Sequence, residues 1–167
     1  MNGGPGPHVD DLLRNARRHA DGFSAGDLPV APALRLAIVA CMDSRIDLFA
    51  LFGLRLGEAH IIRNAGGLVT EDVLRSLTLS QALLGTRELV VLQHTGCGLH
   101  GPAERIRARV ADVSGSDPPW PLGAFDDVDA SVRRQIGILR STPHLTGDSA
   151  RGFVYDVETG LLREVVP

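Results

Sequence analysis

The sequence predicts an α/β fold in a single domain, with a mostly parallel central β-sheet flanked by helices. An N-terminal helical arm and a C-terminal hairpin are predicted to extend this core. Short apolar runs of strand composition alternate with segments of helical periodicity, which is typical of a parallel sheet covered by helices. Two strand-like segments separated by a short turn close the chain. The length of 167 residues suits one domain, and no internal repeat is visible.

The N-terminal segment is predicted to stand outside the core. Residues 1–7 are rich in Gly and Pro and are predicted to be disordered, whereas residues 8–167 are predicted to form the domain. From His8 to about Ala20 the pattern predicts a polar amphipathic helix with a thin apolar side, formed by Val9, Leu12, Leu13 and Ala16. Such a helix needs a surface to lie against, and a partner subunit is a candidate.

Two strands and two helices are predicted in the first half of the domain. Residues 34–40 (LRLAIVA) and 59–62 have the apolar composition of buried strands, the second closed by residues 64–67. A short helix is predicted for residues 47–54, ended by Gly57. A longer helix is predicted to start at the N-cap Thr70, run to about Leu84 and end at Gly85.

The second half repeats this alternation. Residues 88–92 (ELVVL) form a buried strand, and Pro102 opens the next helix. Residues 114–124 contain three prolines and form a loop. A helix over residues 126–140 follows, and residues 152–157 and 161–166 form the terminal hairpin around a Glu-Thr-Gly turn.

The two cysteines of the chain stand in short segments at the ends of predicted strands. Cys41 follows one strand, and His94 and Cys97 follow another. Zinc binds thiolate and imidazole in a tetrahedron, and catalytic zinc keeps one of its four positions for water. Ligands of parallel sheets bind beyond the carboxyl ends of the strands, where these three side chains can converge. Each signal alone is weak, because a disulfide or a buried hydrophobic cysteine would also fit.

Asp43 and Arg45 form a second constraint beside Cys41. In an extended turn alternate positions share a face, so Cys41, Asp43 and Arg45 can point into one pocket. The alternative is a surface ion pair capping the next helix, worth about 0–1 kcal/mol. His100, three residues after Cys97, could shuttle protons or compete as a ligand, or be a loop histidine near solvent.

These segments resemble the β-class carbonic anhydrases. The matching stretches are Cys41-Met-Asp-Ser-Arg45, His60-Ile-Ile-Arg-Asn-Ala-Gly-Gly67 and His94-Thr-Gly-Cys-Gly98. Their residues are similar to those of the short actinobacterial-type branch of the family. The resemblance covers the chain from about His8 to Val166. It implies zinc on Cys41, His94 and Cys97, and reversible hydration of carbon dioxide to bicarbonate and a proton.

The resemblance also implies roles for the neighbouring residues. Asp43 and Arg45 would be the catalytic pair that orients a zinc-bound hydroxide. Independently of the resemblance, Gly98 has no side chain and is expected to leave room beside the metal. In the closed state of some members the aspartate itself ligates zinc, so Asp43 is also a candidate ligand. Those members carry a Trp three residues before the first Cys; here this position is Ile38, which favours the open state.

The donor set predicts the pH dependence. Two thiolates and a neutral imidazole cancel the charge of Zn²⁺, so a water on this metal is expected to ionise less readily than at a three-His site, where its pKa is about 7. The hydration rate is therefore expected to rise into the alkaline range.

Two other functions remain open at this point. Hydrolysis of carbonyl sulfide or carbon disulfide would use the same ligands on a similar linear substrate. A non-catalytic zinc protein would need a site closed by four side chains, and only three soft ligands are present.

Composition narrows the partners and the compartment. The net charge of −3 predicts neither nucleic acid nor an anionic membrane as partner. No apolar run approaches the roughly 20 residues that cross a bilayer, and no signal-peptide core is visible. We therefore expect a cytoplasmic protein. The thin apolar side of residues 9–16 and the resemblance together imply a homodimer or a tetramer of dimers.

Overall fold

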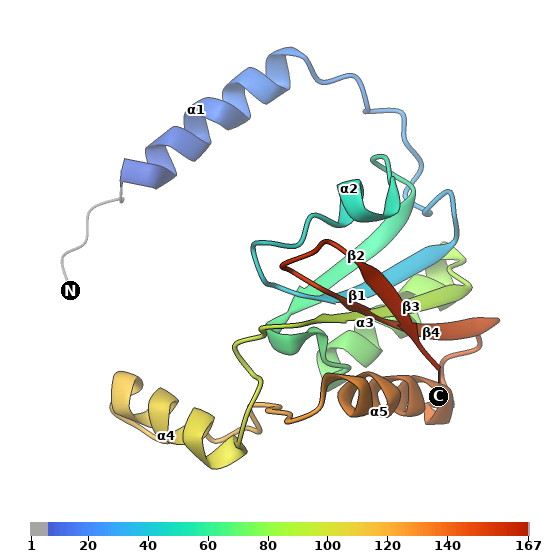
Figure 1. Cartoon of the computed structure of the whole chain (residues 1–167). Helices are drawn as coiled ribbons and strands as arrows, with labels where there is room; N and C mark the ends of the chain where they lie inside the picture. The colour runs from blue at the N-terminus through green and yellow to red at the C-terminus, as the bar shows by residue number, and fades with distance from the viewer. Residues whose placement is uncertain (1–6, 167) are drawn as a thin grey trace.

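The structure is a computed structural model that describes residues 7–166 (Figure 1). The predicted disorder of residues 1–7 lies outside the described residues, except for Pro7, which begins the first helix. The sheet has five strands in the order β2-β1-β3-β4-β5. Their bounds are Leu36–Cys41 (β1), Ala59–Asn64 (β2), Glu88–His94 (β3), Ser149–Tyr155 (β4) and Leu162–Val165 (β5). Four strands are parallel and β5 is antiparallel to β4, which confirms the predicted fold class and terminal hairpin.

The two strands that carry the candidate ligands are neighbours in the middle of the sheet. In β1, residues 37–41 are all buried, as expected for a strand covered on both faces. The register pairs Ala40 with Leu92, so β1 ends at Cys41 about one residue short of the level at which β3 ends. His94 in turn pairs with Tyr155 of β4. The carboxyl ends of β1 and β3 therefore meet at one edge of the sheet.

Helices α3 (Glu71–Leu84) and α5 (Val128–Ser141) cover one face of the sheet. Thr70 caps α3 by accepting a hydrogen bond from the Val73 N–H, and Gly85 ends it in the left-handed conformation, as predicted. The core between these layers contains Val39, Val73, Leu77, Val91, Val132, Ile136 and Val154.

Among residues 7–166, the one helix that packs on the opposite face is the short α2 (Leu48–Phe52). Asp47 caps α2 by accepting hydrogen bonds from two backbone N–H groups. The helix ends at Gly53, with a φ of 64°, so the predicted end at Gly57 is wrong. Several apolar side chains on this face stay only partly buried, among them Val90, Phe153 and Leu162.

Helices α1 (Pro7–Asp21) and α4 (Ala103–Ser114) stand away from the sheet (Figure 1). Residues 8–21 of α1 are all exposed, and α4 contains no buried residue. The thin apolar side of α1 therefore has nothing to cover it within residues 7–166. None of the helices in this range is long and apolar enough to cross a membrane.

Some strand boundaries differ from those expected. The first strand begins at Leu36 and not at Leu34, because Arg35 has a φ of 51° and interrupts the extended backbone. β3 continues through His94, two residues beyond the predicted end, and β4 begins at Ser149 instead of residue 152.

Candidate metal centre

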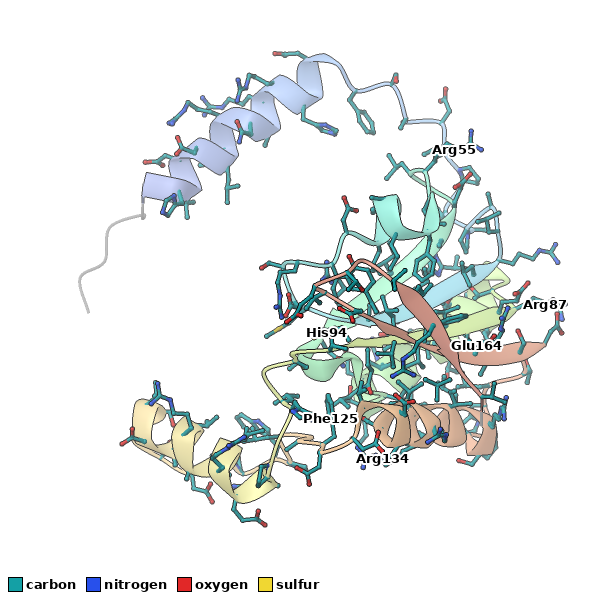
Figure 2. The ribbon with its side chains drawn as sticks, viewed as in Figure 1. Arg55, Arg87, His94, Phe125, Arg134 and Glu164 are labelled. Carbon is teal, nitrogen blue, oxygen red and sulfur yellow. The ribbon has the colours of Figure 1, made fainter. Side chains whose placement is uncertain are left out.

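The three predicted ligands come together at the carboxyl ends of β1 and β3. Cys41 is the last residue of β1, His94 is the last residue of β3, and Cys97 follows in the next loop. Their donor atoms all lie within 4.8 Å of one another. Around a tetrahedral zinc such atoms stand ~3.5–3.8 Å apart, so the group needs little movement to enclose an ion. Figure 2 shows His94 at this edge of the sheet.

His94 is prepared to offer one ring nitrogen. Its Nδ1 donates a hydrogen bond to the Thr95 carbonyl over 2.8 Å, which fixes the tautomer and leaves a lone pair on Nε2. The side chain is 1% exposed, and Nε2 has no hydrogen-bond partner among the described residues. A buried, unpartnered nitrogen costs free energy unless something binds it. Metal-ligating histidines have this arrangement, with the second nitrogen bound to an acceptor. The residues present therefore fit a metal ion.

The two thiols differ in acidity. The neighbouring Cys97 side chain is the main reason why the pKa of Cys41 is lowered. The same neighbour relation raises the pKa of Cys97, with burial as the second cause. The backbone N–H groups of Asp43 and Gly66 also favour the Cys41 thiolate. One thiolate is thus favoured before a metal binds, and a cation displaces the proton of the second.

Arg45 holds the Asp43 carboxylate beside this group. Its Nε and Nη2 donate to the two carboxylate oxygens over 2.9 and 2.7 Å, and its backbone N–H donates to Oδ1. These bonds hold the pKa of Asp43 well below its usual range. Asp43 Oδ2 lies 3.7 Å from His94 Nε2, but Asp43 is not part of the three-residue group. Arg45 also donates to the Gly96 carbonyl, which links the two ligand-bearing loops.

Sequence reasoning assigned no role to two further residues at the site. Arg63, on β2, donates to the carbonyls of Cys41, Asp43 and Ile46. Gln93 is fully buried, and its Nε2 donates to the Gly66 carbonyl over 2.6 Å. In the sequence, Arg63 stands out as a cationic residue on an apolar strand, and Gln93 as an amide next to His94. These two features could have indicated that both residues belong to the site.

Gly67 lets a turn enter between the strand ends. The 3-10 turn η1 (Ala65–Gly67) follows β2 directly. A Cβ on Gly67 would lie 2.7 Å from the Leu92 carbonyl oxygen and 2.9 Å from the Cys41 nitrogen, and its φ is 61°. Only glycine fits this approach without moving backbone.

A cavity of about 330 Å³ opens onto the ligand group, lined by Cys41, Met42, Asp43, Ala65, Gly66, Cys97, Gly98 and Leu99. Most of this lining is apolar. Gly98 lies on its wall, and a Cβ there would meet no atom within 4 Å. His100 does not line the cavity; its Nε2 donates to the Asp126 carbonyl, and the ring lies edge-on to Phe125.

Comparison with known proteins agrees with this geometry. A family model described as carbonic anhydrase matches residues 36–113. The β-carbonic anhydrase 1 of Mycobacterium tuberculosis is 46% identical over 161 residues, which cover 95% of this chain and 98% of the relative.

Two further relatives extend the comparison. A carbonic anhydrase structure from Streptococcus mutans superposes with a TM-score of 0.90 at 38% identity, covering 98% of this chain and 100% of that one. A carbon disulfide hydrolase of Acidithiobacillus thiooxidans is 33% identical over 154 residues, covering 77% of this chain and 76% of the relative. Taken with the Cys–His–Cys group and the parallel sheet that carries it, these similarities show that the chain belongs to the β-carbonic anhydrase family.

Proposed function

We propose that this protein catalyses the zinc-dependent, reversible hydration of carbon dioxide to bicarbonate and a proton. The observation that carries the proposal is the Cys41–His94–Cys97 group with the ionised Asp43 carboxylate facing it. Membership of the family supports the reaction, since the relatives of highest identity described above are named carbonic anhydrases.

The metal we propose is zinc, bound by Cys41, His94 and Cys97. Two sulfur donors and one imidazole select zinc over magnesium or calcium. Zinc in this position would supply a Lewis acid that activates a water molecule for attack, and the two thiolates would place that activation in the alkaline range. A purely structural zinc would need a fourth side-chain ligand, and the metal-ligand group found in residues 7–166 has three members.

Asp43 and Arg45 are proposed to act as a pair. Because its pKa is depressed, the Asp43 carboxylate is ionised and can accept a hydrogen bond from the attacking water. That bond directs a lone pair of the water toward the carbon of CO2. Arg45 holds the carboxylate through two side-chain hydrogen bonds, which keep it from turning onto the metal. This arrangement is the open state; ligation by Asp43 requires these bonds to break.

The cavity suits a small, uncharged substrate. Met42, Ala65 and Leu99 give it apolar walls, against which CO2 displaces water at little cost. Gly98 is proposed to leave space for the substrate, and its backbone N–H to stabilise charge that develops on a bicarbonate oxygen.

The second candidate function is hydrolysis of carbon disulfide or carbonyl sulfide. It is favoured by the 33% identity to a carbon disulfide hydrolase and by the apolar cavity walls. Sulfide release from carbon disulfide, measured on the same preparation as CO2 hydration, discriminates the two. We expect kcat/KM for carbon dioxide to exceed that for carbon disulfide; the reverse order would favour the second function.

The proposal is tested by zinc analysis and stopped-flow CO2 hydration on wild type and three variants. We expect one zinc per chain in wild type and loss of zinc in Cys97→Ser. Asp43→Ala and Arg45→Ala should retain zinc and lose activity ~100-fold, the scale of general acid–base contributions. Less than half an equivalent of zinc in wild type, or full activity in Arg45→Ala, contradicts the proposal.

Assembly and compartment are also proposed. Two surfaces support a homodimer or a tetramer of dimers. They are the exposed apolar side of α1 and the sheet face beside α2, where several apolar side chains stay only partly buried. Cys41 and Cys97 are not joined by a disulfide, and the proposed compartment is the reducing cytoplasm, which keeps cysteines reduced.

A further inference from the structure

We propose that Arg63 is a positioning residue for catalysis: its guanidinium holds the backbone of the loop that carries Asp43, and turnover depends on this hold. The inference rests on the proposed function, because it gives Arg63 a part in the same reaction. Arg63 does not line the cavity around the ligand group, so its effect must pass through another residue.

Arg63 binds three carbonyl groups within six residues. On β2 it pairs in register with Ala40, the residue before Cys41. Its Nε donates to the backbone carbonyl of Cys41 over 3.0 Å. Its Nη2 donates to the backbone carbonyl of Asp43 over 2.6 Å, and its Nη1 to that of Ile46 over 3.2 Å. One planar group thus connects the start, the middle and the end of this loop to the neighbouring strand.

Arg63 connects the Asp43 loop to a neighbouring strand, which Arg45 cannot do. Arg45 binds the Asp43 carboxylate, but both residues belong to the same loop, so they can move together without breaking their bonds. Among the described residues, the loop has few other hydrogen bonds to the rest of the protein. These are the Met42 N–H bond to the Asn64 carbonyl and the single Arg45 bond to the Gly96 carbonyl. Arg63 is therefore the main polar restraint on the Asp43 backbone.

The required precision gives the expected size of the effect. Asp43 Oδ2 lies 3.7 Å from His94 Nε2, so a small loop movement changes where the carboxylate meets the attacking water. A misplacement of about 1 Å costs on the order of 100-fold in rate. The ligand Cys41 is less sensitive, because its own backbone lies in β1 and pairs with β2.

The first experiment compares Arg63→Ala and Arg63→Lys with Arg55→Ala. Lysine keeps the charge but lacks the planar fork that reaches three acceptors. Arg55, labelled in Figure 2, is an exposed arginine whose side chain binds Glu58 and serves as the matched control. We expect kcat to fall ~10- to 100-fold in Arg63→Ala, less in Arg63→Lys and not in Arg55→Ala. Zinc content should stay at the wild-type value in all three.

A double-mutant cycle separates positioning from a general loss of structure. If Arg63 acts through Asp43, then Arg63→Ala should cost less than about twofold in kcat when Asp43 is already alanine. An undiminished loss in the Asp43→Ala background overturns the inference. Loss of zinc from Arg63→Ala overturns it as well, because Arg63 would then stabilise the metal centre. If Arg63→Ala does not fold, the Arg63→Lys variant carries the same comparison.

Hydrogen exchange of the zinc-free protein tests the hold on the loop without any turnover. The Arg45 N–H donates to Asp43 Oδ1, and the Ile46 N–H donates to the Asp43 carbonyl. Both amides should exchange at least ~10-fold faster in Arg63→Ala, while those of β1 stay unchanged. Unchanged loop exchange overturns the inference.

The two proposals can fail separately. A wild-type protein that does not hydrate CO2 removes the proposed function. An active wild type with a fully active Arg63→Ala variant removes only the role of Arg63.

Discussion

At the scale of single residues, the side chains around the metal centre each fix a different property of the site. The Thr95 backbone carbonyl accepts a hydrogen bond from His94 Nδ1–H and so determines which ring nitrogen is free. Arg45 determines the ionisation and direction of the Asp43 carboxylate. Arg63 binds the backbone beneath it. A substitution at one of these positions should therefore produce its own kinetic signature.

The pH profile should not contain the titration of Asp43. Arg45 lowers the pKa of Asp43 below the ordinary value of about 3.9, so the carboxylate is ionised at every pH above that value. Between pH 6 and 9 the wild-type rate should rise, and the rise reports activation of water at the metal. Asp43→Ala should lower the rate at every pH and leave the midpoint in place. A midpoint that moves by more than about one pH unit would assign the titration to Asp43 itself.

Two glycines at the site should respond differently to alanine. Gly67→Ala places a Cβ against two backbone atoms at positive φ and should lower the free energy of unfolding by about 2–5 kcal/mol. Gly98→Ala meets open space at an unstrained φ and should leave stability unchanged while reducing kcat/KM through a smaller cavity. Denaturant unfolding and CO2 hydration measure the two effects. Equal stabilities of the two variants would contradict the assignment of Gly67 to close backbone contact.

At the scale of elements, the approach of α5 to β4 depends on a missing side chain. A Cβ on Gly152 would lie 2.3 Å from Val132 and 2.5 Å from Ile136, both on α5. Gly152 thus sets the separation of this helix from the sheet, and through β4 it supports the strand that carries His94.

Alanine at Gly152 should therefore destabilise the protein by about 1–3 kcal/mol through overpacking. The matched control is Gly137, an exposed glycine within α5 whose Cβ would meet nothing outside its own helix. Gly137→Ala should stabilise by about 0.5–1 kcal/mol, because alanine is the better helix former. Urea denaturation of both variants at fixed zinc concentration measures the difference. Opposite signs are expected, and a neutral Gly152→Ala would show that α5 can shift freely.

Most elements could be predicted from the sequence because their signals are local. Thr70 and Gly85 mark the ends of α3, and apolar composition marks β1 and β3. The convergence of Cys41, His94 and Cys97 was predictable for the same reason, since these residues stand at or just beyond strand ends. The end of α2 at Gly53 was missed because Gly57 offered a similar signal. The contacts of Arg63 were not predictable, because its partners are backbone carbonyls, which every residue carries whatever its side chain.

At the scale of the whole molecule, the protein exposes surfaces that a single chain does not cover. Residues 8–21 of α1 are exposed throughout, and in the described part of the chain one sheet face is covered by no helix other than the short α2 (Figure 1). Val9, Leu12 and Leu13 on α1 are each close to half exposed or more. These surfaces are the physical basis of the proposed assembly.

Charges on the apolar side of α1 should weaken that assembly. Light scattering of wild type should give a mass of at least two chains of 17.8 kDa at micromolar concentration. The double substitution Leu12→Glu and Leu13→Glu should shift the mass toward one chain, because buried unpaired carboxylates are costly. Leu83→Glu, at a leucine that is 73% exposed on α3, is the control and should keep the wild-type mass. A wild-type mass of one chain would rule out the proposed assembly.

The position of the ligands in the sheet has a consequence for the order of folding. Cys41 and His94 are 53 positions apart in the sequence and become neighbours only through the pairing of β1 with β3. Before these strands pair, the members of the group that lie close together in the sequence are His94 and Cys97, and two donors form a weak chelate. The complete ligand group therefore forms only when the sheet assembles. The rate of metal uptake during refolding should then report the rate at which the two central strands pair. An ion that binds this group in the folded chain and not in the unfolded one would also stabilise the pairing of the two strands.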